Sequence, residues 1–410
     1  MNESDGSITE QRDLRTGTSL WTALGTPSIA TRVLEAPGKA DVVIVGAGIT
    51  GALVAEAATA RGLSVFLLDR RPPFHGSTAA STALLQYEID TPFVQLANDV
   101  GFESARRIWQ RSYRAVVDLG RLVGMLVISC HFRPRRALYL AGNILDADAL
   151  AEEGRARRAA GLPSAYLTAA DLRGLAGITR EAALLSDGVA DVNPVLLTSG
   201  LLRRAMARGA ARVYSPTELA EIVPTHEKVA MITADGVELE AKALVFATGY
   251  ELAECVPSTG HRRTSTFAFA TAPQPGAIRG KGELIWEASK PYLYIRTTSD
   301  GRIIVGGEDE ETADERARDA LLPTKIAVLQ QKTKTLMPWI DVGAAFAWCG
   351  TFGESRNGLP SIGPVPGMTN CYAVLGYGGN GLTFGVIAAQ IIAGALCGHA
   401  DKDAPLFTFR

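Results

Sequence analysis

The sequence predicts an α/β protein in which a Rossmann-type dinucleotide-binding lobe is assembled from separate parts of the chain. Three observations predict this fold. A glycine-rich turn follows an apolar strand at 42–45, and later apolar strands at 243–247 and 372–375 end in glycine turns of their own. Ligands bind where the parallel strands of such sheets end, so we expect the three turns to meet at one site. The chain of 410 residues is long enough for a second lobe.

The composition excludes several classes of partner. With 41 basic and 43 acidic residues the net charge is near zero, so no large field recruits nucleic acid or an acidic membrane. The five cysteines are dispersed and lack metal-ligand spacing, which favours a reducing compartment and no metal site. Residues 1–15 lack the apolar core of a signal peptide, so we predict a cytoplasmic protein.

Residues 1–38 form a leader before the first strand. The leader is either a disordered tail or a segment that packs on the body through Leu20 and Trp21. We favour packing, because exposed tryptophan is uncommon in disordered tails.

The stretch 41–51 has the sequence of a dinucleotide-binding turn. In its G-x-G-x-x-G pattern Gly46 permits the tight turn, Gly48 lets the backbone approach a pyrophosphate, and Gly51 lets the next helix pack closely. A second apolar strand, 63–68, ends at Asp69, whose carboxylate can accept hydrogen bonds from a ribose. The residues predicted to contact the dinucleotide here are Gly46, Ala47, Gly48, Ile49, Thr50, Gly51 and Asp69.

A run of small hydroxyl residues follows at 76–86. These residues offer donors to a phosphate, or Ser77 or Thr78 caps a helix start, and the two interpretations are compatible. A long helix is then predicted over 93–126. We assign its arginines to a solvated face: Arg106, Arg107, Arg111 and Arg114.

The segment 93–190 contains no second nucleotide motif and is predicted to be an inserted lobe. It includes a strand at 137–140 and a surface helix at 146–160. After position 191 the pattern returns to the first sheet. The expected elements are a helix at 195–208 and strands at 211–214, 229–233, 237–239 and 243–247.

A hairpin is predicted over 292–307, around the turn 299–301. Strand side chains alternate, so Tyr292, Tyr294 and Arg296 share one face. That face is either a solvated edge or the wall of a polar pocket. A helix at 324–336 follows.

The segment 381–398 carries no charge for 18 residues, the length at which a membrane helix becomes a candidate. It follows a strand and a glycine turn and contains Gln390. We therefore interpret it as a buried helix of the α/β layers rather than a membrane span.

Taken together, the opening turn, the stretches 76–78 and 247–249, the motif 357–363 and the glycines 378–381 resemble the D-amino-acid oxidase superfamily, which contains FAD-dependent amine and amino-acid oxidoreductases. The resemblance spans about residues 18–398. It implies a Rossmann-type FAD-binding domain from the segments 39–92, 191–255 and 345–410. The insertions 93–190 and 256–344 would form an α+β substrate domain with a mixed or antiparallel sheet.

The resemblance also implies further contacts to FAD, which we expect to be non-covalent. Arg70, Ser77 and Thr78 would lie near the adenine, ribose or phosphates, Leu219 would make a backbone contact to adenine, and Thr248 and Gly249 would lie near the dinucleotide. Ser81, Thr82 and Leu84 would run beside the flavin. The pyrimidine edge of the isoalloxazine would meet Gly378, Gly379, Asn380, Gly381, Leu382 and Thr383, where a helix N-terminus stabilises negative charge.

Two departures from the family pattern concern the substrate and the cofactor linkage. Amino-acid oxidases of this type commonly carry an arginine that pairs with the substrate carboxylate, and Phe352 occupies that position. Arg356 or Arg296 could replace it, so carboxylate recognition stays open. Some relatives bind flavin through a cysteine, but Cys349 is displaced by one position, and we predict no covalent bond.

The resulting hypothesis is oxidation of an amine or amino acid, in which hydride passes from the α-carbon to flavin N5 and leaves an imine. Tyr294 and Arg296 are the predicted substrate contacts, and Trp348 and Arg356 the predicted flavin-facing wall. Oxygen or an electron carrier would be the acceptor. The alternatives are a nicotinamide-dependent dehydrogenase, a flavin enzyme for 2-hydroxy acids and an inactive flavin-binding subunit. A nicotinamide enzyme would leave the second and third glycine turns without a role. The sequence does not indicate an oligomeric state.

Overall fold

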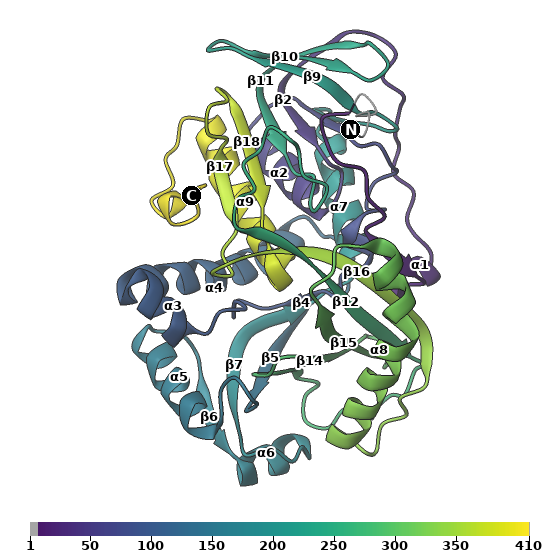
Figure 1. Cartoon of the computed structure of the whole chain (residues 1–410). Coiled ribbons are helices and arrows are strands. Elements are labelled where there is room, and N and C mark those ends of the chain that lie inside the picture. Colours follow the sequence, from purple (N-terminus) through teal and green to yellow (C-terminus); the bar gives the residue numbers. More distant parts are fainter. Residues whose placement is uncertain (1–6, 410) are drawn as a thin grey trace.

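The computed structural model of the chain describes residues 7–409, so residues 1–6 of the predicted leader and position 410 of the last predicted segment lie outside it. Two sheets organise the protein, one of eight strands and one of ten. Figure 1 shows the smaller sheet in the upper half of the molecule and the larger sheet in the lower half. The predicted α/β class, with a mixed second sheet, is confirmed.

The eight-stranded sheet has a parallel centre, and the predicted return of the chain to this sheet is confirmed. β11 lies parallel to β2, with Phe246 opposite Val45. β17 adds an antiparallel edge to β18, while β9 and β10 extend β11 as an antiparallel meander. The strands are β2 (Gly38–Val45), β3 (Val65–Leu68), β8 (Ala211–Tyr214), β9 (Leu219–Pro224), β10 (Val229–Thr233), β11 (Glu238–Phe246), β17 (Ser361–Pro364) and β18 (Cys371–Leu375).

Three helices cover this sheet. α2 (Ile49–Thr59) packs against both α7 (Pro194–Ala207) and α9 (Gly381–Leu396). Within the described range, Gly378–Leu396 is the one helical stretch long and apolar enough to cross a membrane, and 67% of it is buried inside the protein. The buried-helix interpretation therefore holds for α9, whose side chains fill the core against α2.

The ten-stranded sheet is antiparallel except where β13 runs parallel to β5. The predicted hairpin is confirmed as β14 and β15. β16 falls in the segment 345–410 that we predicted for the cofactor domain, yet its neighbours are β1 and β12 of this sheet. The strands are β1 (Arg15–Gly17), β4 (Leu84–Leu85), β5 (Arg133–Leu140), β6 (Ala165–Thr168), β7 (Ala182–Asp191), β12 (His261–Thr271), β13 (Leu284–Glu287), β14 (Leu293–Thr297), β15 (Ile303–Glu310) and β16 (Ala344–Ser355).

The remaining helices surround this second sheet and the junction between the sheets. They are α1 (Leu20–Ala23), α3 (Phe93–Val100), α4 (Phe102–Met125), α5 (Ala147–Ala159), α6 (Ala169–Ala176) and α8 (Glu315–Leu336), with 3-10 turns η1 (Ser77–Ala79), η2 (Gly378–Asn380) and η3 (Ala404–Leu406). In the leader, Leu20 and Trp21 are buried, so the prediction that this segment packs on the body is confirmed.

Two features of the predicted helix 93–126 were wrong. Gly101, at φ +84°, separates α3 from α4, because a residue in that conformation cannot continue a helix. Its arginines are also not a uniformly solvated face. Arg107 and Arg114 pair with Asp403, and the largely buried Arg111 pairs with Asp401, both beyond the end of α9.

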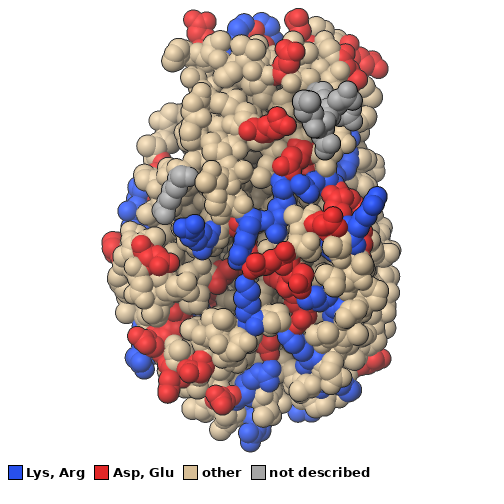
Figure 2. Space-filling model, in the orientation of Figure 1, with Lys and Arg blue, Asp and Glu red and all other residues tan. Residues whose placement is uncertain are grey.

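Charges of both signs are interspersed over the face drawn in Figure 2. This distribution agrees with the near-zero net charge of the whole chain.

Candidate functional site

The glycine turn after β2 has the tight geometry that its sequence predicts. Gly46 adopts φ +108°, and a Cβ on it would lie 2.4 Å from the Ala247 carbonyl oxygen at the end of β11. A Cβ on Gly51 would lie 1.9 Å from the Gly46 carbonyl oxygen. Only glycine fits at either position, since real Cβ atoms do not approach so closely. The start of α2 is thereby pressed against the turn, with its N-terminal N–H groups facing the space beyond β2.

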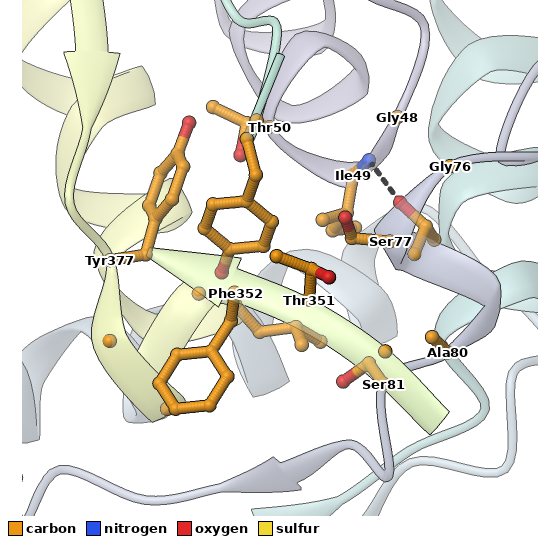
Figure 3. Close-up of a pocket in the computed structure, with 18 of the residues that line it drawn as sticks. Gly48, Ile49, Thr50, Gly76, Ser77, Ala80, Ser81, Thr351, Phe352 and Tyr377 are labelled. Carbon is orange, nitrogen blue, oxygen red and sulfur yellow. Dashed lines mark hydrogen bonds between the residues drawn. The ribbon is translucent and has the colours of Figure 1, made fainter. Parts of the chain in front are cut away.

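A cavity of about 370 Å³ opens at this turn. Its lining includes Gly46 after β2, Thr248 after β11 and Gly378 before α9, so the structure brings the three predicted glycine junctions together. The wall opposite them comes from the second sheet. Figure 3 shows Gly48, Ile49 and Thr50 on one side of this space and Phe352 and Tyr377 on another.

Most of the residues predicted to contact the dinucleotide line this cavity. They are Gly46, Gly48, Ile49, Thr50, Asp69, Arg70, Ser77, Thr78, Ser81, Thr82, Leu84, Leu219, Thr248, Gly249, Gly378, Gly379, Asn380, Gly381 and Leu382. Ala47, Gly51 and Thr383 do not line the cavity. Ala47 and Thr383 instead form hydrogen bonds to residues that do line it. Ala47 N–H donates to Asp69, and the Thr383 hydroxyl donates to the Gln86 carbonyl at 2.7 Å.

Asp69 closes the turn on which the site is built. Its two carboxylate oxygens accept from Ala47 N–H at 2.8 Å and from Arg71 N–H at 2.9 Å. Burial raises the pKa of this carboxyl, and the two backbone donors oppose the rise. Each oxygen keeps a second lone pair, so Asp69 can hold the turn and still accept from a ribose hydroxyl at the cavity wall.

Several buried polar atoms at this cavity have no hydrogen-bond partner in the described chain and could bind a nucleotide. Among residues 7–409, the buried Ser77 Oγ, Arg70 Nη1 and Gln86 Nε2 make no hydrogen bond, and all three residues line the cavity. Buried polar groups are normally paired, so these atoms are suited to phosphate, ribose and flavin oxygens. The site therefore fits FAD.

The expectation that Ser77 or Thr78 caps its own helix start was wrong. The turn η1, in which they lie, has no side-chain cap. Thr78 Oγ1 instead accepts from Ile49 N–H at 3.0 Å, the bond drawn as a dashed line in Figure 3, and so covers the start of α2. The two glycine-rich segments 46–51 and 76–80 are tied together by this bond.

The backbone of residues 80–83, on the way to β4, is held by three side chains from distant parts of the chain. Trp348 Nε1 donates to the Ala80 carbonyl at 2.8 Å, and Trp21 Nε1 donates to the Ser81 carbonyl at 2.6 Å. Arg296 Nη1 donates to the Thr82 and Ala83 carbonyls at 2.9 and 2.8 Å. Four consecutive carbonyls are thus fixed, and we call these three side chains the loop clamp. Trp21 was predicted to pack but not to reach the site, since a donor to a remote carbonyl leaves no local signal.

The four predicted catalytic residues do not come together. Tyr294 lines the cavity, whereas Arg296, Trp348 and Arg356 do not. Arg296 and Trp348 are buried in the loop clamp, and Arg356 is exposed. Arg296 and Trp348 therefore position the backbone of residues 80–83, which belong to the predicted flavin segment.

The end of the cavity beyond the loop clamp combines phenols and carboxyls. Tyr292 and Tyr294 stand on the β14 side, so the predicted polar-pocket face is the one that forms. Burial raises the pKa of Tyr294 to about 12, so its hydroxyl stays protonated. Asp90 and Asp309 line the same end, and burial raises the pKa of each carboxyl to about 6. Both acids were missed, because nothing in the local sequence places them in a cavity.

Flavin is expected to leave the protein on denaturation. Cys349 does not line the cavity, and its Sγ lies 3.7 Å from Asp319 Oδ1 on α8. Burial raises the pKa of this thiol to about 11, which keeps it protonated and unreactive. Acid precipitation of the holoprotein should leave all yellow colour in the supernatant. Colour retained on the polypeptide, and lost in Cys349→Ala, would contradict the non-covalent prediction.

A protein-family model described as FAD dependent oxidoreductase matches residues 41–395 of the chain. Gamma-glutamylputrescine oxidoreductase of Escherichia coli (strain K12) is 24% identical over 371 residues, which cover 88% of this chain and 84% of that protein. The crystal structure of glycine oxidase from Geobacillus kaustophilus superposes with a TM-score of 0.75 at 20% identity, covering 91% of this chain and 99% of that chain. L-proline dehydrogenase from P.horikoshii superposes with a TM-score of 0.73 at 16% identity, over 91% and 97% of the two chains.

Proposed function

The chain belongs to the family of FAD dependent oxidoreductases, and from this premise we propose that it oxidises the C–N bond of an amine or amino acid to an imine. A sequence relative whose name states a substrate, gamma-glutamylputrescine oxidoreductase, supports a nitrogen-containing substrate. A small-molecule amine or amino acid, oxygen or an electron carrier as acceptor, and a cytoplasmic location are parts of this proposal.

The cofactor would be held by residues from all three glycine junctions. Gly46, Gly48 and the first N–H groups of α2 would face the pyrophosphate, with Ser77 and Asp69 supplying the further polar contacts. FAD, when bound, supplies the two-electron acceptor that takes up hydride from the carbon next to the substrate nitrogen. The chain's own residues then have to position that carbon and exclude water.

One observation carries the choice of a C–N bond over a C–O bond. Within residues 7–409 no histidine lines the cavity. A neutral amine expels hydride with the help of its own lone pair, so the C=N bond forms without a strong base. An alcohol must also give up its O–H proton, for which such enzymes need a well-placed base such as histidine. Within residues 7–409 the 2-hydroxy-acid alternative therefore lacks a histidine base at this cavity and would have to use a carboxyl such as Asp309, whose pKa burial raises to about 6.

Anaerobic bleaching of the bound flavin tests this proposal. The yellow holoenzyme should lose its absorbance near 450 nm when mixed without oxygen with a suitable amine or amino acid, because two electrons leave the substrate. Readmitting oxygen then distinguishes an oxidase, whose colour returns, from an enzyme that needs a carrier. Bleaching by 2-hydroxy acids alone would replace the proposal by its alternative. Bleaching by no compound, with flavin fully bound, would support an inactive flavin-binding subunit.

A further inference from the structure

The charge of the cavity lining is strongly one-sided. Eight carboxylate residues line it against two basic residues, Arg70 and Arg71. Both arginines lie at the end near Asp69, where Arg70 donates to Thr9 and Arg71 pairs with Glu251. In the described chain, the end with Tyr292 and Tyr294 is therefore lined by no basic side chain.

This absence removes the usual partner of a substrate carboxylate. Phe352 occupies the position where the resemblance led us to expect an arginine, and it lines the cavity. Neither arginine that could replace this partner lines the cavity. The Arg296 guanidinium donates to backbone carbonyls, and Arg356 is exposed to solvent. A carboxylate placed at this end would meet like charge without a compensating cation.

Two carboxyls at this end carry no cation of their own. Asp90 Oδ2 accepts from Gly379 N–H at 3.0 Å, and no basic side chain within the described range pairs with it. Asp309 Oδ1 is fully buried and has no hydrogen-bond partner among residues 7–409. Glu354 differs, because Arg262 on the outer side pairs with it at 2.8 Å. The unpaired negative charge is thus concentrated on Asp90 and Asp309.

Glu88 is an independent observation at the same cavity. Its side chain is fully buried, and its Oε1 accepts from Arg157 and Ser186. Its Oε2 has no partner in the described chain, although Glu88 lines the cavity. Arg157 also pairs with Glu153, so one cation is shared by two buried carboxyls, and burial raises the pKa of Glu88. A buried carboxylate oxygen left open in this way calls for a donor from a ligand.

These carboxylates are poorly suited to bind the substrate nitrogen that is oxidised. A carboxylate beside an amine stabilises its ammonium form, which has no lone pair with which to expel hydride. The negative charge is better used on a second, non-reacting ammonium of the same molecule. The rings of Tyr292 and Tyr294, 5.9 Å apart, add π faces that attract a cation at this end.

We infer that the substrate is a diamine or N-substituted diamine, whose second, protonated amino group binds Asp309 and Asp90 while its neutral nitrogen is oxidised. This inference rests on the proposed function and narrows it to substrates that need no carboxylate. Asp309 is the stronger contact, since its Oδ1 has no hydrogen-bond partner in the described chain and only the neutral hydroxyls of Tyr292 and Thr266 lie beside the carboxyl. Asp90, in contrast, already accepts from Gly379 N–H at the start of η2.

A matched pair of substrates tests the inference on the holoenzyme. Anaerobic bleaching should proceed at least about 100-fold more efficiently with 1,4-diaminobutane or its N-alkyl derivative than with butylamine, because the monoamine lacks the second charge. Glycine, proline and other α-amino acids should be slower than the diamines. If amino acids or monoamines bleach the flavin better than every diamine, the proposed function stands and the inference is overturned. If nothing bleaches the flavin, the proposed function fails and the inference fails with it.

Variants then locate the contact. Asp309→Asn should raise KM for the diamine by about 10- to 100-fold and leave KM for butylamine unchanged, while Asp309→Glu should restore most of the loss. Asp90→Asn should give a smaller rise in KM. Glu311→Gln, which changes an exposed acid two positions from Asp309, is the control and should change neither value. FAD absorbance and melting temperature verify that each variant is folded. Equal losses for diamine and monoamine in Asp309→Asn would contradict the assignment.

The pH dependence gives a second readout. The carboxyl of Asp309 faces Tyr292, Thr266, Asp90 and Glu354, and burial raises its pKa to about 6, as it does for Asp90. Lowering the pH from 7.5 to 5 should protonate both carboxyls and raise KM for the diamine more than KM for butylamine. The difference between the two substrates should disappear in the Asp309→Asn, Asp90→Asn double variant.

Discussion

Replacing Gly51 by alanine is expected to abolish tight FAD binding. The added methyl group would lie 1.9 Å from the Gly46 carbonyl oxygen, so α2 and the turn cannot keep their present separation. Both atoms belong to the backbone of the cofactor turn, and no flexible side chain can move to relieve the overlap. Overpacking of this kind costs about 1–3 kcal/mol or more. If the binding free energy of FAD is less favourable by that amount, the affinity for FAD falls by roughly 10- to 100-fold.

Titration of the apoprotein with FAD, followed by flavin fluorescence, measures this loss directly. Gly124→Ala is the matched control, since Gly124 lies in α4 and a Cβ on it would meet no atom within 4 Å. That variant should bind FAD normally and be as stable as the parent or slightly more stable. Normal FAD affinity in Gly51→Ala would show that the turn does not carry the cofactor.

Replacing Arg296 by methionine is expected to cause a large loss of stability. Arg296 is 2% exposed, and its Nη1 donates to three carbonyls, those of Thr82, Ala83 and Val192. Methionine fills much of the same volume but offers no donor, so these acceptors remain buried and unpaired. The Nη2 atom of Arg296 also lies 3.6 Å from the buried Asp191 carboxylate. In the variant, Asp191 would keep Arg133 and Arg135 as its cationic partners. Leaving a buried acceptor without a donor commonly costs about 1–3 kcal/mol for each group, so the loss of three hydrogen bonds has a large effect.

Chemical denaturation of the holoprotein measures this change as a shift of the urea midpoint. The loop clamp also predicts an effect that general destabilisation would not produce, namely an altered flavin visible spectrum below the unfolding transition, because the segment 80–83 lies at the cavity. Arg121→Met is the control, since Arg121 is exposed and pairs only with Asp118 in the described chain. An unchanged midpoint and spectrum in Arg296→Met would exclude the clamp as a positioning device.

The sequence predicts the features whose causes are local. The spacing of Gly46, Gly48 and Gly51 predicts one turn, and within it a Cβ on Gly51 would meet the Gly46 carbonyl oxygen only five residues earlier. Alternation along β14 likewise puts Tyr292 and Tyr294 on the cavity side. In both cases, the physical constraint lies in consecutive residues, so it can be read without knowing the fold.

Features that depend on remote partners could not be predicted in this way. Arg296 shares its face with Tyr294 as predicted, but its role depends on carbonyls contributed by the distant residues 82, 83 and 192. Arg111 has the spacing of a solvated helix face, yet Asp401 lies opposite it. Asp309 has no distinguishing neighbours in the sequence, and only the meeting of β15 with the cavity makes it a candidate contact. Tertiary contacts, rather than local propensity, decide all three.

The loop clamp and the cavity also constrain when the protein can acquire its cofactor during synthesis. The lining begins at Ile8 and ends at Leu382, and the carbonyls of 80–83 are fixed in part by Trp348. A growing polypeptide on the ribosome therefore cannot complete the pocket until residue 382 has emerged. Flavin loading consequently follows the synthesis of the first turn of α9, and nascent fragments that stop before α9 should remain colourless.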